Sequence, residues 1–213
     1  MKDVNLNHEP LLIVVSSPSG AGKTSVCKKI LQNDKSIQIS ISSTTRKERH
    51  NELDGVDYNF ISREDFIQKV ENNEFLEYAE VFDNLYGSLK EDVNKIAESK
   101  KDVLFDIDWQ GTQQLYQSKP SNLVSIFILP PSKDEIESRL RQRRADSGDD
   151  ESIINFRMSK FKDEISHWVE YDYVVINENL EICVKEILNI INVERKKRHR
   201  QTDLVDKVRE LTL

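Results

Sequence analysis

A stretch of small residues between Ser17 and Thr24 has the composition of a loop that binds phosphate. It follows the apolar run 11–15, and apolar residues recur after it at helical spacing. Small residues let successive backbone N–H groups converge on an anion, and the positive end of the following helix adds to the attraction. In this pattern Lys23 reaches the β- and γ-phosphates of a nucleotide, and the Thr24 hydroxyl binds Mg²⁺. The predicted contacts are Ser17, Pro18, Ser19, Gly20, Ala21, Gly22, Lys23 and Thr24.

Serine stands at the first position of this loop, where the pattern G-x-x-x-x-G-K-[ST] has glycine. A serine is disfavoured where φ is positive, so either Ser17 keeps a negative φ or the loop is strained. The remainder of the pattern, from Gly20 to Thr24, is complete. We therefore retain the prediction of a nucleotide-binding loop.

Composition sets the class of protein. The chain has 213 residues, of which 37% are hydrophobic and 32% charged, enough for one substantial α/β domain. Its longest apolar runs, 11–15 and 124–129, are too short to span a membrane, and the first ten residues lack the apolar core of a secretory signal. We expect a cytoplasmic protein in which Cys27 and Cys183 are buried free thiols. The net charge of −7 argues against a nucleic-acid partner.

The second half of the chain alternates between strand and helix patterns. Near-continuous β-branched runs at 103–107, 124–129 and 173–176 are typical of buried parallel strands. A helix is predicted from Ser132 to about Arg144, and apolar residues predict another whose buried face carries Ile154, Met158, Phe161, Ile165 and Trp168. The predicted fold is a P-loop NTPase-type parallel sheet flanked by helices.

Residues 37–90 interrupt this alternation and predict a small inserted β-rich lobe. Strands are expected at 37–41, where apolar and polar residues alternate, and at 56–61, and a capping box at Ser62 predicts a short helix. Near the C-terminus the basic run 194–200 is interpreted as a solvated helix face.

A second phosphate-binding element is suggested by Arg46 and Arg49, with Tyr58 close in sequence. Guanidinium groups grip a phosphate with two parallel hydrogen bonds, and a tyrosine hydroxyl adds a neutral donor. On their own, two arginines in a polar loop are more often solvated surface.

Three segments decide the interpretation, because 40–60, 72–88 and 106–111 resemble guanylate kinase. The resemblance is close and extends over about residues 11–190. It implies phosphoryl transfer from ATP to GMP with Mg²⁺, in a guanylate kinase-like domain over 10–190. That domain would comprise a core (10–36 and 91–190), a GMP-binding lobe (about 37–90) and a mobile lid (about 140–158), followed by a helical tail (191–213).

The resemblance also implies roles for single residues. Arg46, Arg49, Tyr58 and Tyr86 would hold the GMP phosphate, and Ser42, Glu77, Ser88 and Asp108 would contact the nucleoside. Guanine offers N1–H and N2–H₂ as adjacent donors, and a carboxylate is the acceptor-only group that pairs with both. Glu77 is therefore the predicted specificity residue, while Asn177 matches a family position near the donor adenine.

Catalysis of this reaction needs alignment and charge neutralisation more than covalent chemistry. The predicted catalytic residues are Lys23, Arg46, Arg139, Arg143 and Arg157, three of them in or beside the lid. Asp106 ends a predicted strand, where a carboxylate faces the nucleotide crevice, so it is the preferred Mg²⁺ ligand together with Thr24. Asp108 is the alternative carboxylate.

Two other functions are compatible with this fold. A scaffold that has lost catalysis would not need Lys23 and Thr24, which are both present. A related kinase could phosphorylate a different small acceptor, but Ser42 and Glu77 favour guanine. The expected partners are ATP and GMP, and the sequence leaves open whether the chain forms a homo-oligomer.

Overall fold

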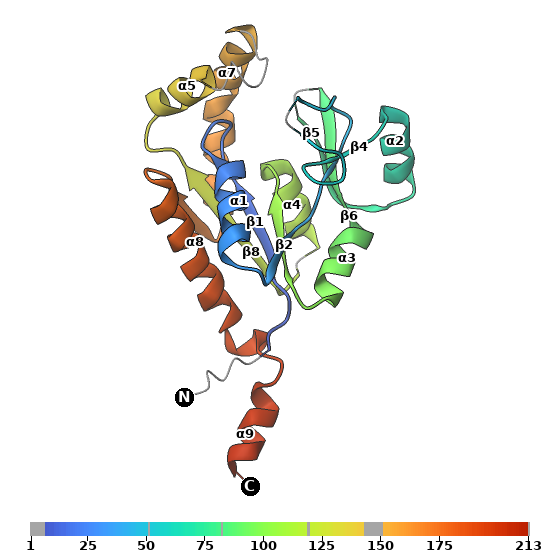
Figure 1. The fold of residues 1–213 in the computed structure, drawn as a ribbon, viewed down its shortest axis with the longest axis vertical. Coiled ribbons are helices and arrows are strands. Elements are labelled where there is room, and N and C mark those ends of the chain that lie inside the picture. Colours follow the sequence, from blue (N-terminus) through green and yellow to red (C-terminus); the bar gives the residue numbers. More distant parts are fainter. Residues whose placement is uncertain (1–6, 51, 82, 119, 143–150, 213) are drawn as a thin grey trace.

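The computed structural model describes residues 7–50, 52–81, 83–118, 120–142 and 151–212. Strands and helices alternate along most of this length (Figure 1). The strands are β1 (Leu12–Ser16), β2 (Ile37–Ile39), β3 (Ser43–Thr44), β4 (Asn59–Phe60), β5 (Phe75–Val81), β6 (Asn84–Leu89), β7 (Asp102–Asp106), β8 (Leu123–Leu129) and β9 (Tyr173–Ile176). The α-helices are α1 (Lys23–Asn33), α2 (Arg63–Glu71), α3 (Lys90–Glu98), α4 (Trp109–Gln117), α5 (Lys133–Gln142), α7 (Glu151–Ser166), α8 (Leu180–Arg195) and α9 (Leu204–Thr212), with 3₁₀ turns at His167–Glu170 and Arg198–Arg200.

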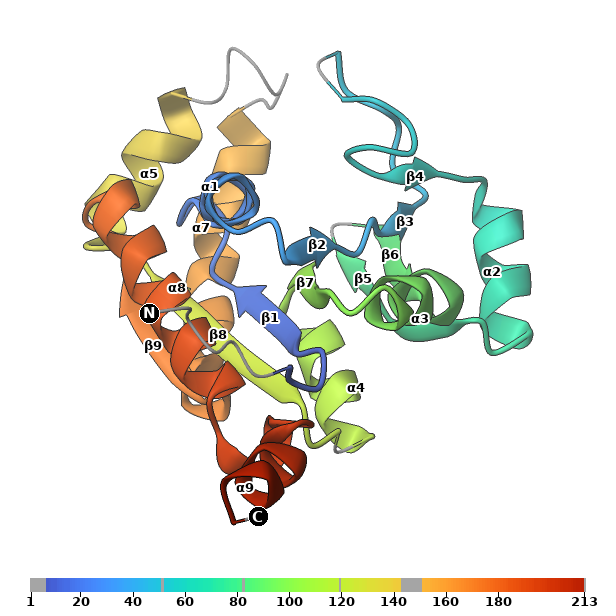
Figure 2. The ribbon, with the colours of Figure 1, turned by 60° about the horizontal axis from the view of Figure 1, so that its bottom comes forward.

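Among the described residues, the main sheet is parallel and has the strand order β2-β7-β1-β8-β9. Its central strands are buried on both faces, which explains their continuous apolar sequences. Helices α1 and α8 pack on one face and α3 and α4 on the other (Figure 2). The predicted α/β fold class is confirmed.

This topology creates a binding crevice at the carboxyl ends of β1 and β7. The chain leaves β1 for α1 on one side of the sheet, whereas β7 leads to α4 on the other. In the parallel register Val15 pairs with Asp106, so Asp106 lies beside the loop that follows Ser16. Ligands of open α/β sheets bind at such a point.

A second, smaller sheet has the order β4-β3-β6-β5 and is built mainly from antiparallel pairs. Helix α2 covers it, with the ring centroids of Phe66 and Phe75 4.4 Å apart. Strand β5 runs from Phe75 to Val81, but another predicted strand of this lobe is shortened. The strand expected at 56–61 is reduced to Asn59–Phe60, because the backbone turns at Gly55, where φ is +73°. The strand expected at 37–41 as part of the lobe ends at Ile39 and belongs instead to the main sheet, where it pairs with β7.

Helices α5 and α7 pack together above the phosphate-binding loop. Ile136, Leu140 and Ile154 form a small apolar cluster with Ala21 of the loop, and Met158 and Phe161 pack against it. The buried face predicted for α7 is wrong at its last residue, Trp168. Trp168 lies in the 3₁₀ turn after α7 and has 48% of its surface exposed, because the change from 3.6 to three residues per turn rotates it out of the apolar stripe.

The basic run near the C-terminus is only partly solvated, which corrects the sequence interpretation. Arg195 forms ion pairs with Asp102 and Asp34, at 2.7 and 2.8 Å. Arg200 is 4% exposed and pairs with Glu194, which is also buried. These pairs join the end of α8 to the body of the protein.

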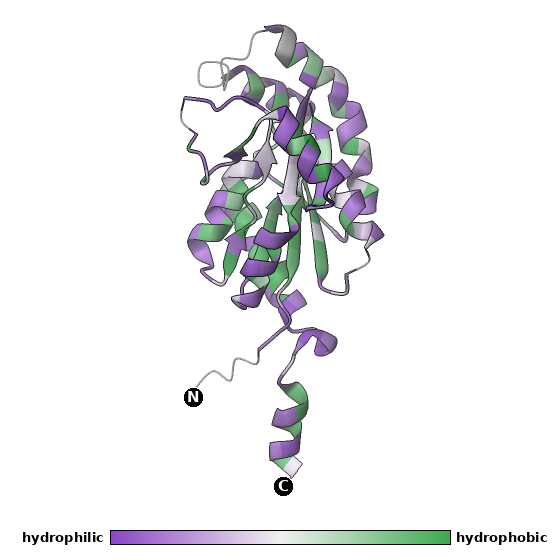
Figure 3. Cartoon of the chain, turned by 90° about the vertical axis from the view of Figure 1, so that its right-hand side faces the viewer, coloured by the Kyte–Doolittle hydropathy of each residue, from purple (hydrophilic) through white to green (hydrophobic). Residues whose placement is uncertain are grey.

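Helix α9 extends away from the main body (Figure 3), and its apolar residues Val205, Val208 and Leu211 are all more than half exposed. Both cysteines, by contrast, are free and buried, as predicted. A search of the described helices finds none with the length and apolar character needed to cross a bilayer.

Candidate active site

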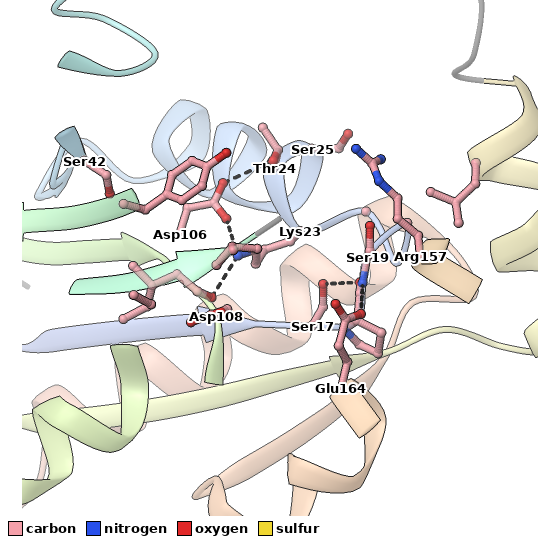
Figure 4. Close-up of a pocket in the computed structure, with 18 of the residues that line it drawn as sticks. Ser17, Ser19, Lys23, Thr24, Ser25, Ser42, Asp106, Asp108, Arg157 and Glu164 are labelled. Atoms are coloured by element: carbon pink, nitrogen blue, oxygen red, sulfur yellow. Dashed lines mark hydrogen bonds and ion pairs between the residues drawn. The ribbon is translucent and has the colours of Figure 1, made fainter. Parts of the chain in front are cut away.

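A cleft of about 400 Å³ opens between the phosphate-binding loop, the β5–β6 hairpin and the helices α5 and α7 (Figure 4). Residues from three distant parts of the sequence meet there. Of the predicted site residues, its walls contain Ser17, Pro18, Ser19, Gly20, Gly22, Lys23, Thr24, Ser42, Tyr58, Glu77, Tyr86, Asp106, Asp108, Arg139 and Arg157. The predicted residues that the structure describes but that do not line the cleft are Ala21, Arg46, Arg49, Ser88 and Asn177. Arg143 lies outside the described residues.

The loop takes a conformation that requires its glycines. Gly20 and Gly22 have φ of +88° and +94°, which side chains rarely adopt. The described non-glycine residues with positive φ are Asn73, Asp83 and Lys100, so Ser17 avoids the strain that its position suggested. Of the two alternatives that the sequence left open, the structure therefore selects a negative φ at Ser17.

Asn177 supports the loop from behind. Its side-chain amide donates a hydrogen bond to the carbonyl oxygen of Ala21 at 2.8 Å, and only 4% of the residue is exposed. A Cβ atom on Gly22 would lie 2.7 Å from the same amide nitrogen. In this arrangement Asn177 fixes the loop backbone, and its predicted role near adenine stays a prediction.

Lys23, Thr24 and Asp106 form the polar centre of the cleft. The ammonium group of Lys23 donates to the carbonyl oxygen of Ile107 at 2.8 Å and lies 3.0 Å from Asp106 Oδ1. Burial alone would lower the pKa of Lys23, but the Asp106 carboxylate outweighs it and holds that pKa above its usual value. The Thr24 hydroxyl donates to Asp106 Oδ2 at 3.1 Å. A permanent positive charge therefore lies where a phosphate group would enter.

The two arginines predicted to bind the GMP phosphate share one acidic partner, Glu52. Glu52 accepts two hydrogen bonds from the guanidinium group of Arg46, each 2.8 Å long, and lies 3.9 Å from Arg49. The same guanidinium lies 5.2 Å from the ring centroid of Tyr58, whose ring is 5.9 Å from that of Tyr86. Glu52 was not predicted, and it contacts both arginines.

Glu77 projects from β5 into the interior of the cleft and is only 3% exposed. The hydroxyl of Ser88 donates a hydrogen bond to Glu77 Oε1 at 2.6 Å and so holds the carboxylate in place. Ser88 itself is fully buried. Burial raises the pKa of Glu77 to about 7, although the Ser88 hydrogen bond partly opposes this. The site thus contains a carboxylate whose charge changes near neutral pH.

Asp108 has a structural task in addition to its place on the cleft wall. Its side chain caps α4 by accepting hydrogen bonds from the backbone N–H groups of Gln110 and Gly111, at 3.0 and 3.1 Å. Ser42 also lines the cleft and is 9% exposed. Asp106 accepts the hydrogen bond of Thr24, whereas Asp108 caps α4, and this difference supports Asp106 over Asp108 as the metal ligand.

Two arginines reach the cleft from the helices above the loop. Arg157 of α7 is 8% exposed, and Arg139 of α5 is paired with Glu135 at 2.8 Å. Together with Lys23 they line one cavity with three cations. Residues 143–150 of the predicted lid lie outside the described residues.

Glu164 is an acidic residue of the cleft wall that the sequence analysis missed. It lies seven residues after Arg157 on α7, and its Oε2 accepts the backbone N–H of Ser19 at 2.9 Å (Figure 4). Burial raises the pKa of this carboxyl. The only signal in the sequence is its position beside Phe161 and Ile165 on the apolar face of the helix, where an acidic residue is unusual.

Comparisons with known proteins identify relatives of this chain. The family model of guanylate kinase matches residues 9–194. The chain is 50% identical over 201 residues to a guanylate kinase of Paramagnetospirillum magneticum, covering 94% of this chain and 92% of that protein. It is 51% identical over 202 residues to one of Cereibacter sphaeroides, covering 94% of each.

A solved structure shares the whole fold. The crystal structure of guanylate kinase from Anaplasma phagocytophilum matches 96% of this chain and 96% of its own, with a TM-score of 0.79 and 35% sequence identity. The nucleotide-binding loop, the acidic and tyrosine residues of the hairpin and the arginines of α5 and α7 therefore occur on a known framework. The chain belongs to the guanylate kinase family.

Proposed function

We propose that this protein transfers the γ-phosphoryl group of ATP to GMP, giving ADP and GDP. The observation that supports this most strongly is a single cleft with two different ends. One end consists of the phosphate-binding loop with Lys23, and the other contains Glu77 and Tyr86 from the second sheet. A donor and an acceptor nucleotide bound at these ends would meet between Lys23 and Arg157.

At the donor end, the backbone N–H groups from Gly20 to Thr24 would surround the phosphates of ATP, and Lys23 would neutralise their charge. Asn177 would contribute by keeping the loop in shape. This arrangement binds the triphosphate through groups that need little reorganisation, which is the main requirement of phosphoryl transfer.

At the acceptor end, the Glu77 carboxylate would accept hydrogen bonds from N1–H and N2–H₂ of guanine. Adenine presents an acceptor at N1, so it would leave the buried carboxylate without a partner there. Ser42, Ser88 and Asp108 would complete the nucleoside contacts. Arg46, Arg49, Tyr58 and Tyr86 would hold the phosphate, with the GMP phosphate replacing Glu52 as the partner of the two arginines.

We assign Mg²⁺ to Thr24 and Asp106. Their oxygen atoms face each other at 3.1 Å, and the pair supplies the hard oxygen ligands that this ion prefers. Two protein oxygen atoms are sufficient, because Mg²⁺ in such sites is held largely by substrate phosphates and water. When bound, the ion would neutralise charge on the phosphate oxygens.

Arg139 and Arg157, with Arg143 from the part of the lid outside the described residues, would stabilise the charge that develops during transfer. We propose that residues about 140–158 act as the lid and about 37–90 as the GMP-binding lobe, and that both close on the substrates to exclude water. The buried free thiols support a reducing, cytoplasmic location, and the net charge of −7 supports a protein without a nucleic-acid partner.

The experiment that tests this function is Mg²⁺-dependent release of ADP from ATP, with GMP, AMP, UMP and CMP compared as acceptors. We expect turnover with GMP and little with the other three. Equal turnover with AMP would contradict the role of Glu77. Folded protein that binds GMP but turns over none of the four would favour the scaffold function.

A second prediction concerns Glu164, which brings a negative charge into a cleft that must hold phosphates. Glu164→Gln keeps an oxygen that can accept the Ser19 N–H and removes the charge. We expect the Kd for ATP at pH 8 to fall about fivefold, equivalent to about 1 kcal/mol. Titration calorimetry measures this directly.

The matched control is Glu170→Gln. Glu170 bonds to Gln113 and His167 and does not line the cleft, so its replacement should leave ATP binding unchanged within about twofold. Weaker ATP binding by Glu164→Gln would contradict the repulsion and indicate that the charged carboxylate is needed to shape the loop.

A further inference from the structure

Gly111 lies in the first turn of α4, directly against the carboxylate of Glu77. A Cβ atom placed on Gly111 would be 2.3 Å from Glu77 Oε2 and 3.1 Å from Glu77 Cδ. Atoms cannot approach so closely, so the absence of a side chain at Gly111 makes room for this carboxylate. The next neighbour, Cδ1 of Ile107 at 3.2 Å, is the mobile end of a side chain.

The backbone conformation gives no other reason for glycine here. Gly111 is helical, and the described glycines with positive φ are Gly20, Gly22 and Gly55. Glycine is a poor helix former, and alanine would suit this position better on propensity alone. The sequence therefore contains a locally unfavourable residue at a point of α4 that lies against Glu77.

The two elements around this contact are held together on both sides of it. The backbone N–H of Tyr78 in β5 donates to Oε1 of Gln114 in α4 at 3.1 Å. The side-chain amide of Gln110 donates to the carbonyl oxygen of Glu80 at 3.3 Å. Because β5 and α4 are joined in this way, a new methyl group between them is accommodated most easily by rotation of the Glu77 side chain.

We propose that Gly111 is a positioning residue for guanine recognition, because it leaves the space into which Glu77 places Oε2. This inference rests on the proposed function, in which Glu77 accepts both donors of guanine. Ser88 holds one oxygen of the carboxylate, and the surface of Gly111 limits the other. Gly111 thus sets the orientation of the Glu77 carboxylate in the cleft, although glycine has no side chain that could contact the base.

The test is Gly111→Ala in two backgrounds, the natural chain and Glu77→Ala. In the natural chain we expect the KM for GMP to rise at least tenfold and the KM for ATP to change less than twofold. In the Glu77→Ala background we expect no further change in the KM for GMP. There we also expect Tm to rise by about 2–4 °C, because the helix gains a better former and the carboxylate is gone.

Each outcome decides the question. An unchanged KM for GMP in Gly111→Ala, an equal rise in both KM values, or the same rise in both backgrounds would overturn the inference. Should Gly111→Ala fail to fold, the double variant is decisive, because the inference requires that variant to fold. Natural protein without GMP kinase activity would overturn the proposed function instead, which separates the two failures.

Discussion

Replacement of Arg157 by alanine is expected to lower kcat by about 10³-fold or more. Arg157 reaches the cleft from α7 with only 8% of its surface exposed, and it lines the same cavity as Lys23. Phosphoryl transfer depends on neutralising charge on the phosphate oxygens, and a buried guanidinium does so more strongly than an exposed one. Single-turnover measurement with saturating ATP and GMP isolates this effect from substrate binding.

The control for Arg157 is Arg141→Ala. Arg141 carries the same charge on the neighbouring helix α5, but it pairs with Glu137 and Glu151 and is not among the cleft-lining residues. We expect its kcat to stay within about twofold of that of the natural protein. Arg157→Lys should give an intermediate rate, because lysine keeps the charge and loses the planar fork. An Arg157→Ala variant with unchanged kcat and a raised KM would contradict a catalytic role.

Much of the fold could be predicted because its signals are local. The loop from Ser17 to Thr24 has a fixed spacing of residues, and the strands of the main sheet are continuous apolar runs. Ser62 caps α2 as expected, since the hydroxyl accepts the backbone N–H of Asp65 and the two residues are near in sequence. Such patterns depend on residues within one turn or one strand of each other.

The features that the sequence missed depend on partners far along the chain. Arg195 belongs to a basic run that resembles solvated surface, yet Asp102, on β7, draws it against the sheet. Glu164 bonds to Ser19, 145 residues away, and only the packing of α7 on the loop brings them together. Neither pairing leaves a periodic pattern that a sequence analysis could detect.

The candidate site likewise contains residues that could be predicted from the sequence and residues that could not. Tyr58 and Glu77 could be placed in the cleft because the resemblance to the family covered their segments, whereas chemistry alone left Arg46 and Arg49 as plausible surface residues. The acidic partner Glu52 was not predicted, although it lies only three residues after Arg49. A glutamate in a charged loop has many possible partners, and only the three-dimensional course of the loop selects one.

The KM for GMP is expected to fall about tenfold per pH unit between pH 5 and pH 7 and to level off above pH 7. Burial raises the pKa of Glu77 to about 7, so below this pH the carboxyl is mostly protonated. A protonated carboxyl offers a donor where guanine also offers one, and the base is then poorly matched. GMP therefore binds the ionised form, so below pH 7 the Glu77 carboxyl must lose its proton before GMP can bind.

The matched control is Glu77→Gln, which cannot ionise. Its KM for GMP should be raised about 10²-fold or more at pH 8, with the KM for ATP nearly unchanged. The phosphate of GMP has its own ionisation near pH 6, and this contributes equally to both proteins. The difference between the two pH profiles therefore reports Glu77 alone, and parallel profiles would contradict its ionisation near pH 7.

The pH dependence of protein stability provides an independent measurement of the ionisation of Glu77. The raised pKa means that the folded state binds a proton more tightly than the unfolded state, whose ordinary value is 4.5. Below pH 4.5 both states are protonated and burial of the charge costs nothing. The cost develops as pH rises from 4.5 to 7 and is complete above pH 7, at about 3 kcal/mol.

Glu77→Gln should therefore raise the free energy of unfolding at pH 8 relative to the natural protein, and this gain should disappear near pH 4.5. Urea titrations at the two pH values measure it. A gain of the same size at both pH values would show that folding does not raise the pKa of Glu77. A gain confined to high pH would mean that the buried charge weakens the fold, and that its retention is explained by guanine recognition.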